Sequence, residues 1–184
     1  YIGNLYPNIF QDLKHLEHIY TSFPEGKIKR ETMETGGKTK EDLQKELKEQ
    51  NIKISGYAQD MLDNPDFTTS KNKEQTDLVR LTVKGLGFDS SATTDQIYKK
   101  AEELGLELCP AEVGPQYRLE YTDQSQGEWV YVGMKQINDS DGSPNVFYLG
   151  RHGDDPWLDD YWAIPDYYWY PDDEFVFSIR KLDT

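Results

Sequence analysis

The residues best suited to chemistry lie in one run of the sequence, between positions 157 and 173. Acidic and aromatic side chains are interleaved there: Trp157, Asp159, Asp160, Tyr161, Trp162, Tyr167, Tyr168, Trp169, Asp172 and Asp173, with His152 a few residues earlier. Aromatic rings supply flat apolar faces with polar rims, which suit both protein interfaces and sugar rings. Aspartates accept hydrogen bonds from hydroxyl groups or pair with lysine and arginine. We therefore interpret this run as a candidate binding surface.

Alternation along an extended chain predicts the orientation of part of this run. Successive side chains of a strand point to opposite faces, so Tyr167 and Trp169 share one face and Tyr168 and Tyr170 the other. We expect one pair in the core and the other exposed. Rings that only filled a sheet core would bury the interleaved charges, which is costly. We also expect at least one of the three tryptophans of the run to be exposed beside exposed aspartates.

Catalytic and cofactor motifs do not stand out. The sequence has no nucleophile elbow, P-loop, zinc-protease motif or dinucleotide fingerprint. His15 and His18 are close enough to share a helix face, but a zinc site needs about three protein ligands, so we interpret them as solvated. His152 could form an acid–base pair with Asp154 or Asp155, although a turn after a strand explains the same residues. We predict no catalytic residue, metal or cofactor, and the sequence favours a protein without enzymatic activity.

Two further features have simpler structural interpretations. Cys109 is the single cysteine, which excludes an intramolecular disulfide, and no basic residue flanks it to lower its pKa. We expect a small buried side chain there.

The loop DSDGSPN at 139–145 has carboxylates suited to calcium, but in the EF-hand register its first ligand position falls on Ile137. We predict a hairpin turn.

The charge balance limits the classes of partner. The 184 residues include 34 acidic and 20 basic ones, which gives a net charge of −14 and an isoelectric point near 4.6. This disfavours binding through the phosphate backbone of nucleic acids, which needs clustered lysine and arginine. No apolar run approaches the roughly 18–20 residues of a membrane span. With one cysteine and no signal-peptide pattern, we expect a cytoplasmic location.

Acidic and aromatic residues are both concentrated toward the C-terminus. The segment 139–184 holds 11 acidic and 3 basic residues, a net charge of −8, and 11 of the 24 aromatic residues lie within 147–177. Such a charge would attract a cationic surface and repel an anionic one. The pattern favours a basic protein as the partner.

The N-terminal part, 1–67, is predicted to be a small helical unit. A helix follows Pro7, with apolar residues at helical spacing up to Tyr20, and 24–38 is predicted to be a loop. Thr39 and Asp42 indicate a capping box at the start of a second helix. A third short helix over 57–62 ends before Pro65.

The segment 68–77 has no apolar side chain and is predicted to be a linker to an α+β domain over 78–184. Thr93 and Gln96 cap its one main helix, which ends near Gly105. Predicted strands cover 78–83, 117–121, 128–137, 146–150 and 174–182, with a hairpin loop at 138–145. One helix against a mostly antiparallel sheet defines the α+β class.

Part of this domain resembles a family of uncharacterised bacterial proteins. The resemblance rests on the run LGLELCPAEVGP at 104–115, and on Tyr117, Arg118, Leu119, Trp129, the DSDG loop at 139–142, Val146 and Phe147. It covers about 86–180. The resemblance implies a bacterial origin and a self-contained C-terminal domain, and it carries over no activity and no functional residue.

Three hypotheses for the function follow from these patterns. The first is a non-enzymatic protein-interaction module whose acidic, aromatic C-terminal surface contacts a basic protein. The second is a carbohydrate-binding or glycoside-hydrolysing domain that uses stacked aromatics and two aspartates drawn from Asp154, Asp155, Asp159, Asp160 and Asp166. The third is an acidic nucleic-acid mimic. The exposure of the tryptophans, and whether they line a cleft or a flat patch, distinguishes the three.

Overall fold

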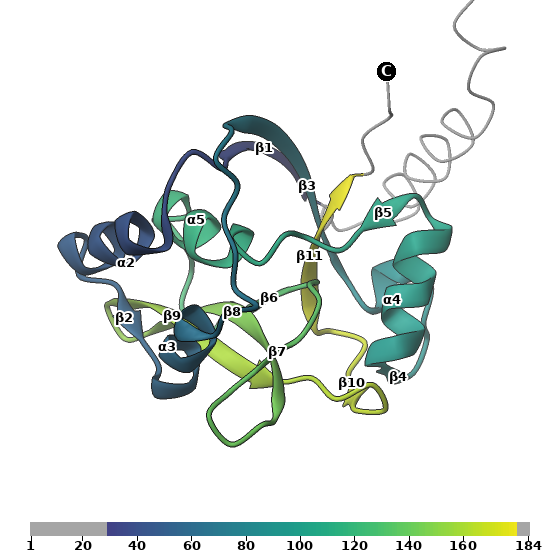
Figure 1. Ribbon diagram of the computed structural model, residues 1–184. Helices are drawn as coiled ribbons and strands as arrows, with labels where there is room; N and C mark the ends of the chain where they lie inside the picture. The colour runs from purple at the N-terminus through teal and green to yellow at the C-terminus, as the bar shows by residue number, and fades with distance from the viewer. Residues whose placement is uncertain (1–28, 180–184) are drawn as a thin grey trace, which may run out of the picture.

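The structure, a computed structural model, describes residues 29–179 and has the α+β class expected from the sequence (Figure 1). The described elements are β1 (Lys29–Thr35), α2 (Lys40–Glu49), β2 (Lys53–Ile54), α3 (Gly56–Asp63), β3 (Glu74–Thr82), the 3-10 turn η2 (Lys84–Leu86), β4 (Ala92–Thr93), α4 (Thr94–Glu103), β5 (Leu106–Glu107), α5 (Val113–Glu120), β6 (Val130–Val132), β7 (Ile137–Asn138), β8 (Pro144–His152), β9 (Asp155–Trp162), β10 (Tyr168–Trp169) and β11 (Glu174–Ile179). The helix predicted after Pro7, with His15 and His18, lies outside the described residues, as do 180–182.

A large, mostly antiparallel sheet organises the described chain. Its strands lie in the order β1-β3-β11-β6-β8-β9-β2, with β5 added to β11 and β7 to β8. Two pairs are parallel, β11 with β6 and β2 with β9. The longest hairpin joins β8 to β9, from the pair Asn145 and Trp162 to the pair His152 and Asp155. This hairpin carries much of the acidic, aromatic run.

Helices cover the two faces of the sheet at different places. At the β8–β9 end, α5 approaches so closely that a Cβ atom at Gly114 would lie 2.6 Å from the ring of Phe147, and Phe67 also packs edge-on against that ring. In the middle of the sheet, Tyr98 of α4 packs edge-on against Phe177 of β11. Figure 1 shows α2, α3 and α5 gathered near β8 and β9, and α4 beside β4 and β5. The β8–β9 face opposite Phe147 carries the aromatic side chains described below.

The helix starts predicted from capping residues are confirmed. Thr39 and Asp42 form the reciprocal capping box of α2, and Thr93 and Gln96 form that of α4. The short helix α3 ends before Pro65. Gly105 has φ 84°, the left-handed conformation that glycine adopts readily after a helix. Local side-chain-to-backbone bonds are therefore sufficient to fix these boundaries.

Two segments have a different structure from the one predicted. Within 24–38, expected to be a loop, residues Lys29–Thr35 form the edge strand β1, which buries Met33 and Thr35 against its neighbour. The strand predicted over 117–121 is wrong, because Val113–Glu120 form α5. Pro115 lies in the first turn of this helix, where a missing N–H group removes no helical bond.

The other predicted strands of the C-terminal part are confirmed with changed bounds, as far as they lie within the described residues. The expected strand over 128–137 is divided into β6 and β7, and the expected strand over 146–150 lies inside the longer β8. Ile137 pairs with Asn145, so the predicted hairpin loop joins β7 to β8. The segment from Asp155 to Trp162 forms β9.

The sheet includes residues from both sides of the predicted linker. β1 pairs with β3, and β2 pairs with β9, so strands that precede position 68 share a sheet with the rest. β3 begins at Glu74, inside the segment 68–77, and Leu43, Leu47 and Phe67 belong to the common core. Whether 78–184 fold without 1–67 stays a prediction. No helix within 29–179 has the length and apolar character needed to cross a membrane.

Candidate binding surface

Strand β9 presents alternate members of the acidic, aromatic run on one face of the sheet. Asp155, Trp157, Asp159 and Tyr161 share this face, because strand side chains alternate. Across the antiparallel pair with β8, His152 lies opposite Asp155, Gly150 opposite Trp157 and Tyr148 opposite Asp159. The register therefore brings His152, Trp157 and Asp159 of the predicted site together.

Asp159 is the acidic centre of this face. Its Oδ2 atom accepts a hydrogen bond of 2.9 Å from the hydroxyl of Tyr148 and lies 3.7 Å from Nε2 of His152. Its Oδ1 atom accepts a hydrogen bond from the backbone N–H of Asp160. Burial, and then the hydrogen bond to Asp159, raise the pKa of Tyr148, so this phenol stays protonated as a donor. The carboxylate is fixed in position by neighbours from two strands.

Two indoles flank this centre. Trp129, one residue before β6, is 46% exposed, and its ring centroid lies 6.0 Å from that of Tyr148. Trp157 is partly exposed and packs edge-on against His152, with centroids 5.5 Å apart. Gly150 lies between the two indoles in the sheet register. We call this set the Trp129–Trp157 face: Trp129, Tyr148, Gly150, His152, Trp157 and Asp159.

A series of ring contacts connects this face to the segment between β9 and β11. Tyr148 contacts Tyr161 at 6.1 Å between centroids, and Tyr161 contacts Tyr167 at 5.7 Å. The hydroxyl groups of Tyr161 and Tyr167 share a hydrogen bond of 2.8 Å. Tyr167 in turn contacts Trp162. These four rings therefore form one connected series of contacts.

The segment between β9 and β11 is held by a buried anchor. Trp169 is 1% exposed, and its indole N–H donates to the hydroxyl of Thr94 at 2.8 Å. The backbone N–H of Thr94 donates to the carbonyl of Tyr167. Further along, the N–H of Lys84 donates to the carbonyl of Pro171. Trp169 was a candidate binding residue, and the structure places it in the core.

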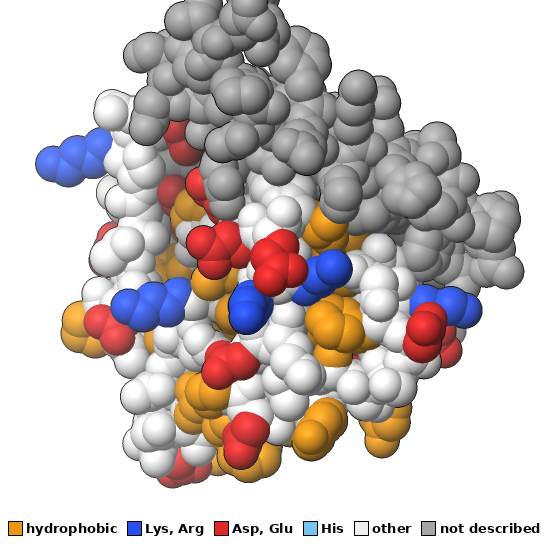
Figure 2. All heavy atoms as spheres, turned by 90° about the vertical axis from the view of Figure 1, so that its right-hand side faces the viewer, with side chains coloured by type: hydrophobic (Ala, Val, Ile, Leu, Met, Phe, Trp, Pro, Cys, Tyr) orange, Lys and Arg blue, Asp and Glu red, His pale blue; other side chains and the backbone are white. Residues whose placement is uncertain are grey.

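The outward side of this segment is rich in exposed rings. Trp162 is 49% exposed, Tyr168 64% and Tyr170 70%, and the side chains of Asp166 and Asp172 are exposed as well. These five residues are called the exposed strip. The burial pattern follows the predicted alternation, with Tyr168 and Tyr170 outside. Figure 2, which faces the end of the molecule formed by α4, β4 and β5, shows hydrophobic and acidic side chains close together in its lower part and basic ones across its middle.

Two aspartates of the predicted site have structural contacts instead. Asp160 points to the opposite face of β9 and accepts a hydrogen bond of 2.6 Å from the hydroxyl of Ser55, the N-cap of α3. Asp173 accepts the backbone N–H of Tyr170 at 2.7 Å. Burial raises the pKa of both carboxyl groups. Their hydrogen bonds fix the positions of α3 and of the exposed strip.

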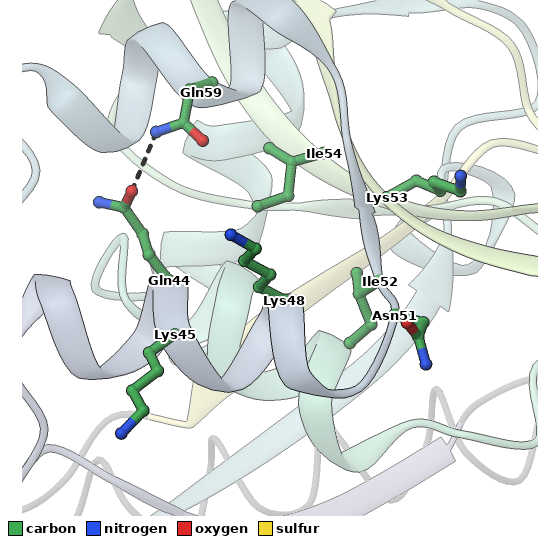
Figure 3. Close-up of a pocket in the computed structure, with 8 residues that line it drawn as sticks. All are labelled: Gln44, Lys45, Lys48, Asn51, Ile52, Lys53, Ile54 and Gln59. Carbon is green, nitrogen blue, oxygen red and sulfur yellow. Dashed lines mark hydrogen bonds between the residues drawn. The ribbon is translucent and has the colours of Figure 1, made fainter.

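A cavity of about 590 Å³ lies beside α2 and, unlike the acidic candidate surface, is lined by basic side chains. Its lining includes Lys45, Lys48 and Lys53. Figure 3 shows Lys48 extending between α2 and β2 towards Ile54, with the hydrogen bond between Gln59 and Gln44 at one side. The cavity lies outside the candidate surface, although Lys53 pairs with Trp157 in the β2–β9 register.

The remaining sequence candidates also have defined environments. Cys109 is buried, as expected, and burial raises the pKa of its thiol, which opposes thiolate chemistry. Asp139 accepts the N–H groups of Asp141 and Ser143 and the side-chain amide of Asn145, so its carboxylate stabilises the hairpin turn. Within 29–179, no three histidine, cysteine or acidic side chains are placed to hold a metal ion together.

Comparisons with known proteins return no match for this chain. No family model matches the sequence, and searches of curated proteins and of solved structures find no similar protein. What the structure defines is a class of fold, an α+β protein with a mostly antiparallel sheet. The resemblance of about 86–180 to an uncharacterised bacterial family stays an expectation.

Sequence reasoning missed two aromatic residues of the Trp129–Trp157 face, Trp129 and Tyr148. Both lie outside the dense run at 157–173 and reach it only through strand pairing. A register for β8 and β9, aligned across their connecting turn at Gly153, would have placed Tyr148 opposite Asp159. No local signal identifies Trp129, because it depends on the neighbouring strand β6.

Proposed function

We propose that this protein is a non-enzymatic interaction module that binds a basic protein through the exposed strip. The observation that carries the proposal is the exposure of Trp162, Tyr168 and Tyr170, with the exposed Asp166 and Asp172 in the same stretch of chain. Aromatic surface costs about 25 cal/mol per Å² when left in water, so clustered exposed rings mark contact surfaces. Tyrosine and tryptophan are also enriched among the residues that dominate binding energies.

The backbone beneath the strip supports the same proposal. Trp169 is buried and bonded to Thr94, and backbone hydrogen bonds tie Pro165 and Pro171 to neighbouring segments. A surface that is already ordered loses little conformational entropy on binding. The exposed rings are therefore presented on a rigid support.

Charge favours a basic partner. Asp166 and Asp172 are exposed on the strip, and the segment 139–184 carries a net charge of −8. The exposed Lys84, which is bonded through its backbone to Pro171, is a neighbouring positive charge. The acidic excess steers a cationic surface to this side and accelerates association at low salt.

The test is capture of a partner from a lysate of the encoding organism, followed by affinity measurement with the purified partner. We expect the double variant Tyr168→Ala/Tyr170→Ala to weaken binding more than about tenfold. Tyr57→Ala is the matched control, because Tyr57 is an exposed tyrosine on α3 and is not part of the strip. We expect the control to bind as the unmodified protein does, and added salt to weaken binding.

Other results would favour the alternative hypotheses. Equal binding by the double variant and the control would overturn the proposal. Selective binding of an oligosaccharide, lost in the same double variant, would indicate the carbohydrate function. Capture of a DNA-binding protein that DNA then displaces would indicate the nucleic-acid mimic.

A further inference from the structure

We infer that the Trp129–Trp157 face binds one cationic side chain, lysine or arginine, of the basic partner. The inference rests on the proposed function and names the chemical group that the protein recognises beside the exposed strip. The two surfaces are connected through the rings of Tyr148, Tyr161 and Tyr167. One partner could therefore contact both at once.

The spacing of the two indoles suits a narrow side chain such as that of lysine or arginine. Trp129 directly precedes Val130, which pairs with Leu149, so the β6–β8 register extended by one residue places Trp129 beside Gly150, and Gly150 pairs with Trp157. Adjacent strands are about 4.8 Å apart, so the backbones of the two tryptophans are separated by about 10 Å. The residue between them has no side chain. The two indoles therefore form the sides of a shallow site.

The floor of this site is built from two more rings. A Cβ atom at Gly150 would lie 3.1 Å from Cε2 of Tyr148 and 3.5 Å from Nε2 of His152. The glycine therefore lets both rings lie against the backbone, where they occupy the position that a side chain at 150 would take. An aliphatic stem can pack on these rings while its charged end lies over an indole.

The charges of the face select a cation. Asp159 lies beside the floor, with an Oδ2 atom already oriented by the hydroxyl of Tyr148, and Asp155 shares its face. An ammonium or guanidinium group placed here gains both a carboxylate partner and the negative faces of the indoles. The exposed Lys53, opposite Trp157 in the register, is the opposing charge on the β2 side. A neutral sugar would gain stacking and hydrogen bonds from its hydroxyl groups to Asp159, but no pairing of opposite charges.

The first experiment locates binding with a synthetic probe. A peptide of alternating lysine and glycine is titrated into the isotope-labelled full chain, and the four indole N–H signals are followed by NMR. We expect the signals of Trp129 and Trp157 to shift and that of Trp169 to stay, because Trp169 is buried and bonded to Thr94. A matched glutamate–glycine peptide is expected to cause no shift.

Variants then test the chemistry. Asp159→Asn keeps an oxygen acceptor for Tyr148 and removes the charge, so affinity for the lysine peptide is expected to fall about tenfold. Trp129→Ala is expected to weaken it to a similar extent. Asp154→Asn is the matched control, since Asp154 is exposed at the turn between β8 and β9, and a change below about twofold is expected. Lys53→Gln is expected to strengthen binding.

The outcomes separate this inference from the proposed function. Unshifted Trp129 and Trp157 signals, equal losses in Asp159→Asn and Asp154→Asn, or equal shifts with a neutral oligosaccharide would overturn the inference. Tyr168→Ala/Tyr170→Ala is expected to leave the peptide-induced shifts unchanged. A partner that binds normally to this double variant would overturn the proposed function, while the peptide titration would still decide the inference.

Discussion

The hydroxyl of Tyr148 donates a hydrogen bond of 2.9 Å to Oδ2 of Asp159 across the β8–β9 pair. Tyr148 is 8% exposed, and the side chain of Asp159 is 17% exposed. A carboxylate at this depth needs a donor, because an unpaired buried charge is costly. This hydrogen bond therefore stabilises the β8–β9 hairpin and also holds the charged group at the centre of the Trp129–Trp157 face in position.

The first prediction concerns this pair. Tyr148→Phe keeps the ring and removes the donor, and we expect it to lower the free energy of unfolding by about 1–2 kcal/mol. The measurement is urea denaturation at neutral pH. In a double-mutant cycle with Asp159→Asn, the two changes are expected to be less than additive, because each weakens the same hydrogen bond. Strict additivity would show that the charge of Asp159 does not strengthen the bond.

The second prediction is a pH dependence from Asp160. Burial raises the pKa of this carboxyl group, so the folded state disfavours its ionised form. The contribution of Asp160 to the free energy of unfolding is therefore fully present at a pH below the pKa that its carboxyl group has in the unfolded chain. It is lost as the pH rises through the raised pKa of the folded state. Asp160→Asn can still accept the hydrogen bond from Ser55. We expect it to raise the melting temperature at pH 7.

The control for Asp160→Asn is the same comparison in acid. At a pH below both pKa values the unmodified protein carries a neutral carboxyl group, so the two melting temperatures are expected to converge. A gap between them that stays constant with pH would show that ionisation of Asp160 does not set the difference.

Features encoded by neighbouring residues could be predicted from the sequence. The capping boxes at Thr39 and Thr93 depend on residues three positions apart, and the exposure of Tyr168 and Tyr170 follows from alternation. Features set by distant pairing could not. Asp160 points away from Asp159 by alternation, but the packing of its face against α3, whose N-cap Ser55 lies 105 positions earlier, depends on distant contacts.

The predicted strand over 117–121 failed for a related reason. Its residues Tyr117, Arg118 and Leu119 are all buried, so no polar face marks the segment as an amphipathic helix. The helix α5 is buried on nearly every side by β1, β8, β9 and α2. Helical periodicity disappears from the sequence when a helix has no solvent-exposed face.

The third prediction compares the effect on stability of removing the buried ring of Trp169 with that of removing its exposed neighbours. Trp169→Ala removes a fully buried indole and is expected to lower the free energy of unfolding by about 3–5 kcal/mol. Tyr168→Ala and Tyr170→Ala, at exposed neighbours, are expected to change it by less than about 0.5 kcal/mol each. Thermal or urea denaturation of the three single variants checks this. A large loss for Tyr170→Ala would show that its ring is part of the packing.

The fourth prediction concerns Arg118, a buried guanidinium that supports the candidate surface from the opposite face. It donates to the carbonyl of Gly150 at 3.1 Å, to the side chain of Gln124 and to the carbonyl of Tyr121. Arg118→Met leaves these acceptors without their donor, and we expect a loss of about 2–4 kcal/mol in the free energy of unfolding. Arg118→Lys keeps the charge but reaches fewer acceptors, so an intermediate loss in denaturation experiments is expected.

The last prediction concerns the division of the chain near 68–77. The sequence predicts that 78–184 fold alone, and the structure gives a physical reason to expect that they need the preceding residues. Without them, β3 loses its pairing with β1 and β9 its pairing with β2. Leu43, Leu47 and Phe67 would also leave the common core and expose its remaining residues to water.

The fragment 78–184 is therefore compared with the full chain by thermal denaturation and amide NMR. We expect the full chain to unfold in one cooperative transition and the fragment to show none, with poorly dispersed amide signals. A fragment starting at 29 is the matched control, since it retains β1, α2, β2 and α3, and it is expected to melt cooperatively. A cooperative transition in 78–184 would confirm the independent domain and show that strands β1 and β2 only add to a sheet that is already stable.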